Sequence, residues 1–117
     1  MYALANKLDL QHIEDWARLT YIECLEAGYT AIGEFHYLHH RPDGAAWENP
    51  IASSEAILRA ARQAGIRINL LWTVYARGGF DRDLTPNQRR FGAASITEIW
   101  RSIDRVMDLG QDPKRQI

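Results

Sequence analysis

Cysteine, excess charge and long apolar runs are scarce in this sequence of 117 residues, and each scarcity excludes a class of protein. Cys24 is the only cysteine, which excludes an internal disulfide and a cysteine-based zinc site and suits a reducing, cytoplasmic setting. The 14 basic and 15 acidic residues are mixed along the chain, so charge gives no reason to expect nucleic acid or an anionic membrane as a partner. No apolar run approaches the roughly 18 residues of a membrane span, and the first residues do not predict a signal peptide.

Motifs of several common chemistries are missing too. The sequence contains no Walker loop, no Gly-x-Gly-x-x-Gly, no His-Glu-x-x-His and no Gly-x-Ser-x-Gly. Its composition, 46% hydrophobic and 25% charged, is nevertheless that of an ordinary globular protein. The stretch richest in reactive side chains is 34–40, Glu-Phe-His-Tyr-Leu-His-His, which holds three of the four histidines.

Apolar periodicity and helix-ending glycines divide the chain into five elements. Asp9 can cap the first helix, because its carboxylate can accept the free amide hydrogens of the first turn, and Gly28 ends that helix. Asn49-Pro50 opens the second helix, and a capping box at 95–98 opens the third, which we expect Gly110 to end. The expected elements are a helix at 10–27, a strand at 29–37, a helix at 50–64, a strand at 66–75 and a helix from residue 95 onwards.

The order α-β-α-β-α predicts an α/β fold whose two strands are parallel neighbours joined by a right-handed crossover. Both long loops follow strands, on the side where barrels and doubly wound sheets bind ligands. The second strand is apolar on both faces near its middle, as in a parallel sheet that is covered on both sides. Two strands are too few to close a core, so we expect residues 1–117 to be a single partial domain. It would belong to a larger α/β fold or assemble with copies of itself, and 110–117 would lead into a third strand.

The stretch 34–40 offers several candidate functional residues. Glu34 and His36 share one face of the first strand, where they either point into a catalytic cavity or form a buried pair that supports the sheet. His36, His39 and His40 are poorly spaced for a metal site, so a loop histidine that contacts substrate or solvent fits better. Tyr37 either donates a hydrogen bond to an anionic ligand or plugs the strand end.

The remaining candidates lie in the second long loop and on the packed faces. Four arginines of this loop could each bind a carboxylate in a bidentate manner, although a solvated loop is the default expectation. We expect Trp47 and Trp72 to pack, and Cys24 to lie on the packed face of the first helix as a small hydrophobic residue. The four arginines are Arg77, Arg82, Arg89 and Arg90.

Residues 25–40, Leu-Glu-Ala-Gly-Tyr-Thr-Ala-Ile-Gly-Glu-Phe-His-Tyr-Leu-His-His, resemble the formimidoylglutamate deiminases, a family of the amidohydrolase superfamily. The strings Glu-Phe-His-Tyr-x-His-His and Gln-Arg-Arg-Phe are fairly specific for this family within the superfamily. The likeness covers residues 1 to 91 and weakens beyond. Further matches follow in the same order at Asp43-Gly44, Asn49-Pro50, Ala64-Gly65-Ile66, Tyr75, Gly78-Gly79-Phe80 and Gln88-Arg89-Arg90-Phe91.

This resemblance implies two consecutive β/α units of a zinc-dependent (β/α)8 barrel, which hydrolyses N-formimino-L-glutamate to N-formyl-L-glutamate and ammonia in histidine degradation. It implies that Tyr37 contacts the glutamate carboxylate of the substrate, and His36 and His39 are further candidate substrate contacts. The metal ligands and catalytic residues of the family have no counterpart in this sequence, so we expect neither bound zinc nor a catalytic residue in this chain alone. The chain then looks like an inactive internal fragment that requires the remainder of the barrel. The alternative is a non-catalytic α/β module that binds a small anion or self-associates.

Overall fold

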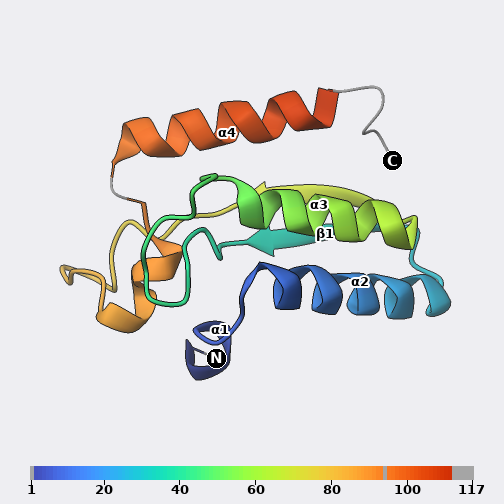
Figure 1. The fold of residues 1–117 in the computed structure, drawn as a ribbon, viewed down its shortest axis with the longest axis horizontal. Coiled ribbons are helices and arrows are strands. Elements are labelled where there is room, and N and C mark those ends of the chain that lie inside the picture. Colours follow the sequence, from blue (N-terminus) through green and yellow to red (C-terminus); the bar gives the residue numbers. More distant parts are fainter. Residues whose placement is uncertain (1, 94, 112–117) are drawn as a thin grey trace.

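Helices and strands alternate along the chain in the predicted order, with two additional short helices (Figure 1). The structure, a computed structural model, describes residues 2–93 and 95–111. The expected third strand therefore falls largely on residues 112–117, outside the described residues. The elements are α1 (Tyr2–Ala5), α2 (Leu10–Glu26), β1 (Ala31–His36), α3 (Ala52–Ala64), β2 (Arg67–Trp72), the 3-10 helix η1 (Pro86–Phe91) and α4 (Ile96–Gln111).

The boundaries of several elements differ from the prediction. Both strands have six residues and are shorter than expected at each end. The second helix begins at Ala52 rather than at Pro50, because Asn49 forms a turn in which its side chain accepts from the amide of Ile51 at 3.3 Å. Gly65 ends this helix as predicted, in the left-handed conformation at φ 85°. The prediction that Gly110 ends the last helix is wrong, since α4 continues through it to Gln111.

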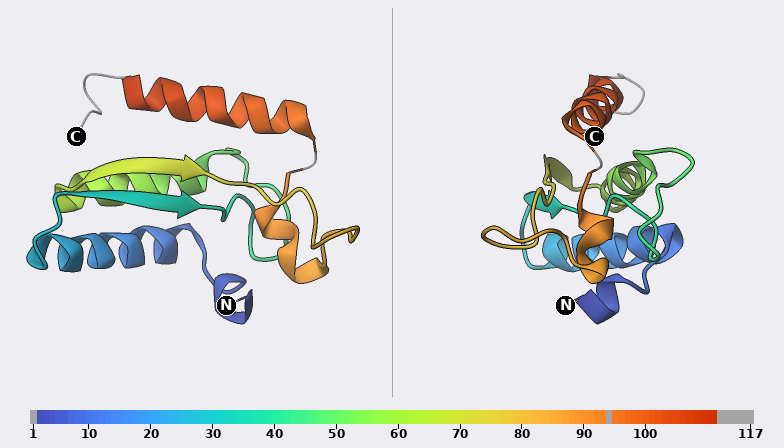
Figure 2. Two further views of the ribbon diagram at one scale, coloured as in Figure 1. Left: turned by 180° about the vertical axis from the view of Figure 1, so that it is seen from behind. Right: turned by 90° about the vertical axis from the view of Figure 1, so that its left-hand side faces the viewer.

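The two strands form a parallel sheet in which Ala31 pairs with Arg67 and His36 with Trp72. This arrangement confirms the predicted parallel neighbours. The helices α2 and α3 cover one face of the sheet, and the opposite face is turned away from them (Figure 2). Phe35 on that opposite face is 65% exposed, and Asn69 beside it is also exposed. Within the described residues, the second strand is therefore covered on one face, although its sequence is typical of a strand covered on both.

The core lies between the helices and the covered face of the sheet. The small residues that the sequence places on one face of α3 allow the close approach of α2, and Ala56, Ala60 and Ala61 are completely buried. Asp9 caps α2 as predicted, by accepting from the amide of His12 at 2.9 Å. The other buried members of this core are Ile13, Tyr21, Ile57 and Ile66.

The last helix, α4, lies beside this core and makes few contacts with it (Figures 1 and 2). Its apolar stripe has the predicted spacing, but Ile96, Trp100 and Met107 are 65%, 60% and 57% exposed. Polar groups hold the helix instead, because Arg105 donates to the side chain of Asn49 at 3.0 Å. No helix among the described residues has both the length and the apolar character required to cross a membrane.

Candidate functional site

Three aromatic rings gather beyond the carboxyl ends of the two strands. Tyr37 directly follows β1, Tyr75 follows β2, and Phe91 closes η1. The ring of Tyr37 lies 5.5 Å from that of Phe91, edge to face, and 6.2 Å from that of Tyr75. A parallel bridge between Tyr75 and Gly92 brings the end of η1 alongside the chain that leaves β2. Tyr37 is half-buried, and it lies on the side where parallel β/α folds bind ligands.

The side chains of Glu34 and His36 point toward the helices, not toward the opposite face of the sheet. The hydroxyl of Tyr21 on α2 donates to Glu34 at 3.4 Å, and His36 Nε2 lies 3.1 Å from the hydroxyl of Ser53 on α3. The expected Glu34–His36 pair is not formed, since each residue contacts a helix instead. Glu34 also lines an open cavity of about 220 Å³ beside α2, whereas His36 does not. Strand alternation explains this, because the apolar neighbours Ile32 and Ile68 share the same face.

Burial sets the ionisation of both groups. It raises the pKa of the Glu34 carboxyl, against the opposing effect of the hydrogen bond from Tyr21. Burial also raises the pKa of Tyr21, as does the neighbouring charge of Glu34. For His36, which is 3% exposed, burial lowers the pKa to about 3, and the nearby His39 adds to the effect. His36 is therefore neutral at physiological pH.

His39 is buried behind the strand ends, although it lies in a loop. Its Nε2 donates to the carbonyl oxygen of Thr73 at 2.5 Å, and its ring lies against that of Trp72 with centroids 4.1 Å apart. The rings of His36 and His39 meet edge to face at 5.3 Å. Burial lowers the pKa of His39 to about 4, more than the hydrogen bond to Thr73 raises it. His39 thus joins the chain after β1 to the chain after β2.

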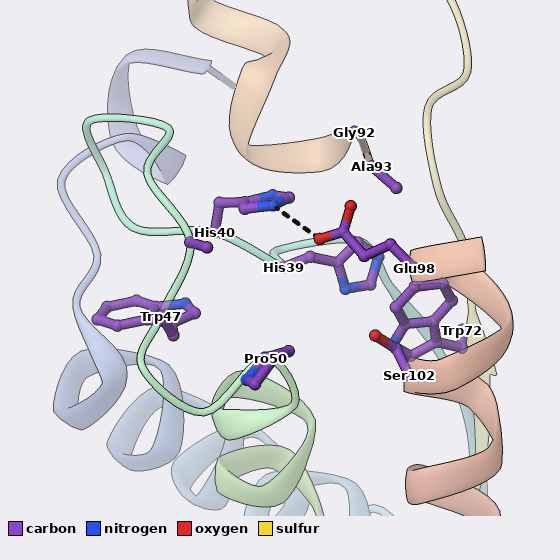
Figure 3. Close-up of a pocket in the computed structure, with 10 residues that line it drawn as sticks. His39, His40, Trp47, Pro50, Trp72, Gly92, Ala93, Glu98 and Ser102 are labelled. Carbon is purple, nitrogen blue, oxygen red and sulfur yellow. Dashed lines mark ion pairs between the residues drawn. The ribbon is translucent and has the colours of Figure 1, made fainter. Parts of the chain in front are cut away.

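His40 connects the same loop to α4 across a small cavity (Figure 3). Its Nε2 lies 3.7 Å from a carboxylate oxygen of Glu98. The volume of this cavity is about 10 Å³, which is room for about one water molecule. The cavity is therefore too small for a substrate. Its lining is formed by His39, His40, Ala46, Trp47, Pro50, Trp72, Gly92, Ala93, Glu98 and Ser102.

The described residues do not fit a metal ion. Within residues 2–93 and 95–111, no three His, Cys, Asp or Glu side chains come together as a possible metal site. The Nε2 atoms of two clustered histidines already have partners, Ser53 for His36 and Thr73 for His39. We therefore derive no chemical step through a metal from the residues of this chain.

One of the four loop arginines departs from the default expectation of a solvated side chain. Arg90 is 1% exposed, and its guanidinium donates to the backbone carbonyls of Ala5 and Leu8. Burial lowers its pKa. Arg77 pairs with Asp81 at 3.3 Å on the surface, as a solvated loop would allow. The other two arginines, Arg82 and Arg89, are also exposed.

Sequence reasoning missed the compact structure of this loop. Gln88 accepts from the amide and the hydroxyl of Thr85 at 3.0 and 2.9 Å, and it donates to the carbonyl of Gly78 at 3.3 Å. The signal was present, because Thr85-Pro86-Asn87-Gln88 is a capping-box sequence with proline at the first helical position. Gly78 is required there, since a Cβ would lie 2.3 Å from the carbonyl oxygen of Asp83.

The remaining expectations concern packing residues. Trp72 packs on His39, and Trp47 lines the small cavity of Figure 3. Cys24 is a half-buried free thiol that packs against the core, which confirms the expected role as a small hydrophobic residue.

Comparison with known proteins gives these features a context. The chain is 45% identical over 102 residues to formimidoylglutamate deiminase from Pseudomonas aeruginosa, a match that covers 85% of this chain and 22% of that protein. The chain resembles a segment of this deiminase. A crystal structure of an amidohydrolase from Brucella melitensis superposes with a TM-score of 0.84 and 36% identity, over 92% of this chain and 24% of that one. No family model matches the chain.

These comparisons confirm the predicted resemblance to formimidoylglutamate deiminase and the predicted fold class. The parallel β/α arrangement of this chain is that of consecutive units of an amidohydrolase barrel. The chain spans about a fifth of the length of the deiminase that it matches.

Proposed function

We propose that this chain forms part of a cytoplasmic, zinc-dependent hydrolase that deiminates N-formimino-L-glutamate in histidine degradation. The reaction adds water to the formimino carbon and releases its terminal nitrogen as ammonia, which leaves N-formyl-L-glutamate. The observation that supports the proposal most is the 45% identity to formimidoylglutamate deiminase over most of this chain. The zinc, when bound, would activate the attacking water, and residues other than the described ones would have to hold it.

In this proposal, Tyr37 donates a hydrogen bond from its phenol to the glutamate carboxylate of the substrate. Its half-buried position beyond the end of β1 supports such a role. His36 and His39 are the further predicted substrate contacts. Their hydrogen bonds to Ser53 and Thr73 favour a supporting role behind the substrate wall, and direct contact with substrate stays a prediction.

A chimera tests this function directly. The 102 matched residues of the Pseudomonas deiminase would be replaced by the corresponding residues of this chain, and ammonia release from N-formimino-L-glutamate would be measured. We expect turnover, and we expect Tyr37→Phe to lower kcat/KM by about 10–100-fold, the value of a hydrogen bond to a charged group. Tyr29→Phe, at a tyrosine that is 61% exposed, is the matched control and should have no effect. A folded chimera without turnover would contradict the proposal.

We further propose that the chain alone is inactive. The purified 117-residue chain should release no ammonia from N-formimino-L-glutamate and should retain no zinc after dialysis against a weak chelator. Stoichiometric zinc together with turnover by the isolated chain would overturn this part of the proposal and leave the substrate assignment intact.

The second candidate function is a non-catalytic α/β module that self-associates or binds a small anion. The exposed apolar side chains of Phe35, Trp100 and Met107 favour self-association, as do the strand edges of a two-stranded sheet. Sedimentation of the isolated chain at several concentrations tests it. A concentration-dependent dimer combined with an inactive chimera would favour the module, whereas a monomer at all concentrations would exclude self-association.

A further inference from the structure

In residues 88–91, Gln-Arg-Arg-Phe, one of the two adjacent arginines is buried and the other is exposed, and the sequence alone does not explain this difference. Gln88, Arg90 and Phe91 are 8%, 1% and 0% exposed, whereas Arg89 between them is exposed. A buried arginine is costly unless its guanidinium is fully engaged, so the placement of Arg90 requires a reason. Its Nη1 and Nη2 donate to backbone carbonyls, whereas its Nε is buried with no hydrogen-bond partner among the described residues.

The side chain of Arg90 fixes η1 to the beginning of the chain. Its Nη1 donates to the carbonyl of Ala5 at the end of α1, and its Nη2 donates to the carbonyl of Leu8 at 3.0 Å. The first carbonyl belongs to the last residue of α1 and also accepts from the amide of Leu8 at 3.2 Å. The second lies in the short connection between α1 and α2. A single planar guanidinium can satisfy two such acceptors at once, which the point charge of a lysine cannot do in the same geometry.

The backbone of Arg90 holds the segment that follows Tyr37. Its carbonyl oxygen accepts from the amides of His39 at 3.0 Å and His40 at 3.2 Å. These amides lie two and three residues after Tyr37, so the path of the chain beyond the tyrosine depends on where Arg90 sits. The same residue thus ties together three segments that are distant in the sequence.

The next residue, Phe91, holds the ring of Tyr37 itself. Its completely buried ring meets Tyr37 edge to face at 5.5 Å and lies 5.4 Å from the ring of Tyr75. Its carbonyl accepts from the amide of Tyr75 at 2.8 Å, which fixes Phe91 relative to the end of β2. Tyr37 is therefore held through its following backbone by Arg90 and through its ring by Phe91.

We propose that Arg90 is a positioning residue, which acts through Phe91 and through the 39–40 backbone to hold the Tyr37 ring in the orientation that binds the substrate carboxylate. The role of Tyr37 in binding the substrate carboxylate rests on the proposed function. The structural link from Arg90 to Tyr37 does not depend on it. Arg90 itself touches no substrate in this assignment, although loop arginines are the usual candidates for binding a carboxylate.

The link is tested without substrate, on the full 117-residue chain labelled with 3-fluorotyrosine. The fluorine resonance of Tyr37 among the five tyrosines is identified by its loss in Tyr37→Phe. We expect Arg90→Lys to shift the Tyr37 resonance and leave that of the exposed Tyr29 in place. Arg89→Lys, the neighbouring exposed arginine, is the matched control and should move neither. A folded Arg90→Lys chain with an unmoved Tyr37 resonance would overturn the proposal.

A second variant covers the case in which Arg90→Lys does not fold. A chain that begins at Lys7 lacks the Ala5 acceptor but keeps Arg90, Phe91 and Tyr37, together with all of α2, α3 and the sheet. We expect the Tyr37 resonance of this chain to shift as well, although the change lies at a distance from the ring. An unmoved resonance in the truncated chain would then decide against the proposal.

The functional consequence is tested in the active chimera. Arg90→Lys should raise KM for N-formimino-L-glutamate by about tenfold with a smaller change in kcat, and Arg89→Lys should change neither. In the Tyr37→Phe background, Arg90→Lys should raise KM no further, since both changes remove the same contact. An unchanged KM in Tyr37→Phe would refute the proposed role of Tyr37. In that case, a shift of the Tyr37 fluorine resonance in Arg90→Lys would still support the link from Arg90 to the Tyr37 ring. Additive increases in KM would refute positioning and leave the role of Tyr37 intact.

Discussion

The helices α3 and α4 both carry apolar residues at helical spacing, and they differ in what those residues contact. In α3, Ala56, Ala60 and Ala61 are completely buried against α2 and the sheet. In α4, Ile96 and Trp100 are 65% and 60% exposed, although its apolar stripe is at least as regular. An amphipathic pattern therefore predicts which face of a helix would be buried. Whether that face is buried depends on a partner surface at the right place.

The largest expected difference between the two helices is in core energetics. Ile57→Ala in α3 should lower the free energy of unfolding by about 2–5 kcal/mol, because it removes a side chain that is 5% exposed and leaves a cavity. Ile96→Ala in α4 should lower it by less than about 0.5 kcal/mol, because that side chain is largely in water. Urea denaturation measures both. Equal losses would show that the two helices are packed alike and would end the comparison.

The second effect is a pH dependence on the α3 side. The folded pKa values of His36, about 3, and His39, about 4, lie below the ordinary value of 6.5, so the unfolded chain binds protons first. Their stabilising contribution is complete above about pH 6.5 and is lost as the pH falls toward those folded values. At pH 5 the free energy of unfolding should be about 2–4 kcal/mol lower than at pH 7.5.

Chemical denaturation across that pH range, with His36→Gln as the comparison, measures this contribution. The variant keeps a group that can bond to Ser53 but cannot titrate, so its stability should fall less steeply below pH 6.5. The same slope in both proteins would show that His36 does not bear the pH dependence.

The third effect concerns the polar contacts that hold α4. Arg105→Ala removes the exposed hydrogen bond to Asn49, and it should lower the free energy of local opening of α4 by about 0.5–1 kcal/mol. Hydrogen exchange of the α4 amides measures this, with Arg101→Ala on the same exposed helix as the control. Amides of α3 should be unaffected. If α3 amides exchange faster too, the two helices open as one unit.

The smallest expected change in stability comes from the exposed apolar face of α4. Trp100→Glu should leave the free energy of unfolding within about 0.5 kcal/mol, because the indole is 60% exposed. It should nevertheless weaken any self-association, since it places a charge on the apolar stripe. Sedimentation at several concentrations measures this, with Thr97→Glu on the same helix as the charge-matched control. An equal effect of both variants would show that charge, not the apolar stripe, controls association.

Local signals in the sequence predicted most of the fold. Asp9 as a cap, Gly65 as a helix end and the apolar spacing of α2 and α3 each depend on a few neighbouring residues, so they can be read from the chain. The α1 turn was missed because its four residues have no distinctive cap or period. The 3-10 helix was missed although its capping box was present, because the glycines and arginines before it suggested an open loop.

The candidate site was predicted less completely than the fold. The sequence pointed to the stretch 34–40 and, through its resemblance, to Tyr37. It did not predict the contacts of the two polar side chains on the helix-facing side of β1. A carboxylate and an imidazole on one strand suggested a cavity or a mutual pair, whereas the structure shows contacts with Tyr21 and Ser53. The buried role of Arg90 was also out of reach, because its acceptors lie more than eighty residues away in the sequence.

Local patterns along the chain were enough to predict the α/β order, the parallel pairing of the strands and the family that the chain resembles. Apolar periodicity, helix caps and helix-ending glycines each depend on a few neighbouring residues. They can therefore be interpreted without knowledge of the rest of the molecule. Contacts between distant segments established which amphipathic face is covered, which histidines are neutral and which arginine is buried. Those properties depend on groups brought together from distant parts of the chain, and burial and hydrogen bonding fix them only after the chain has folded.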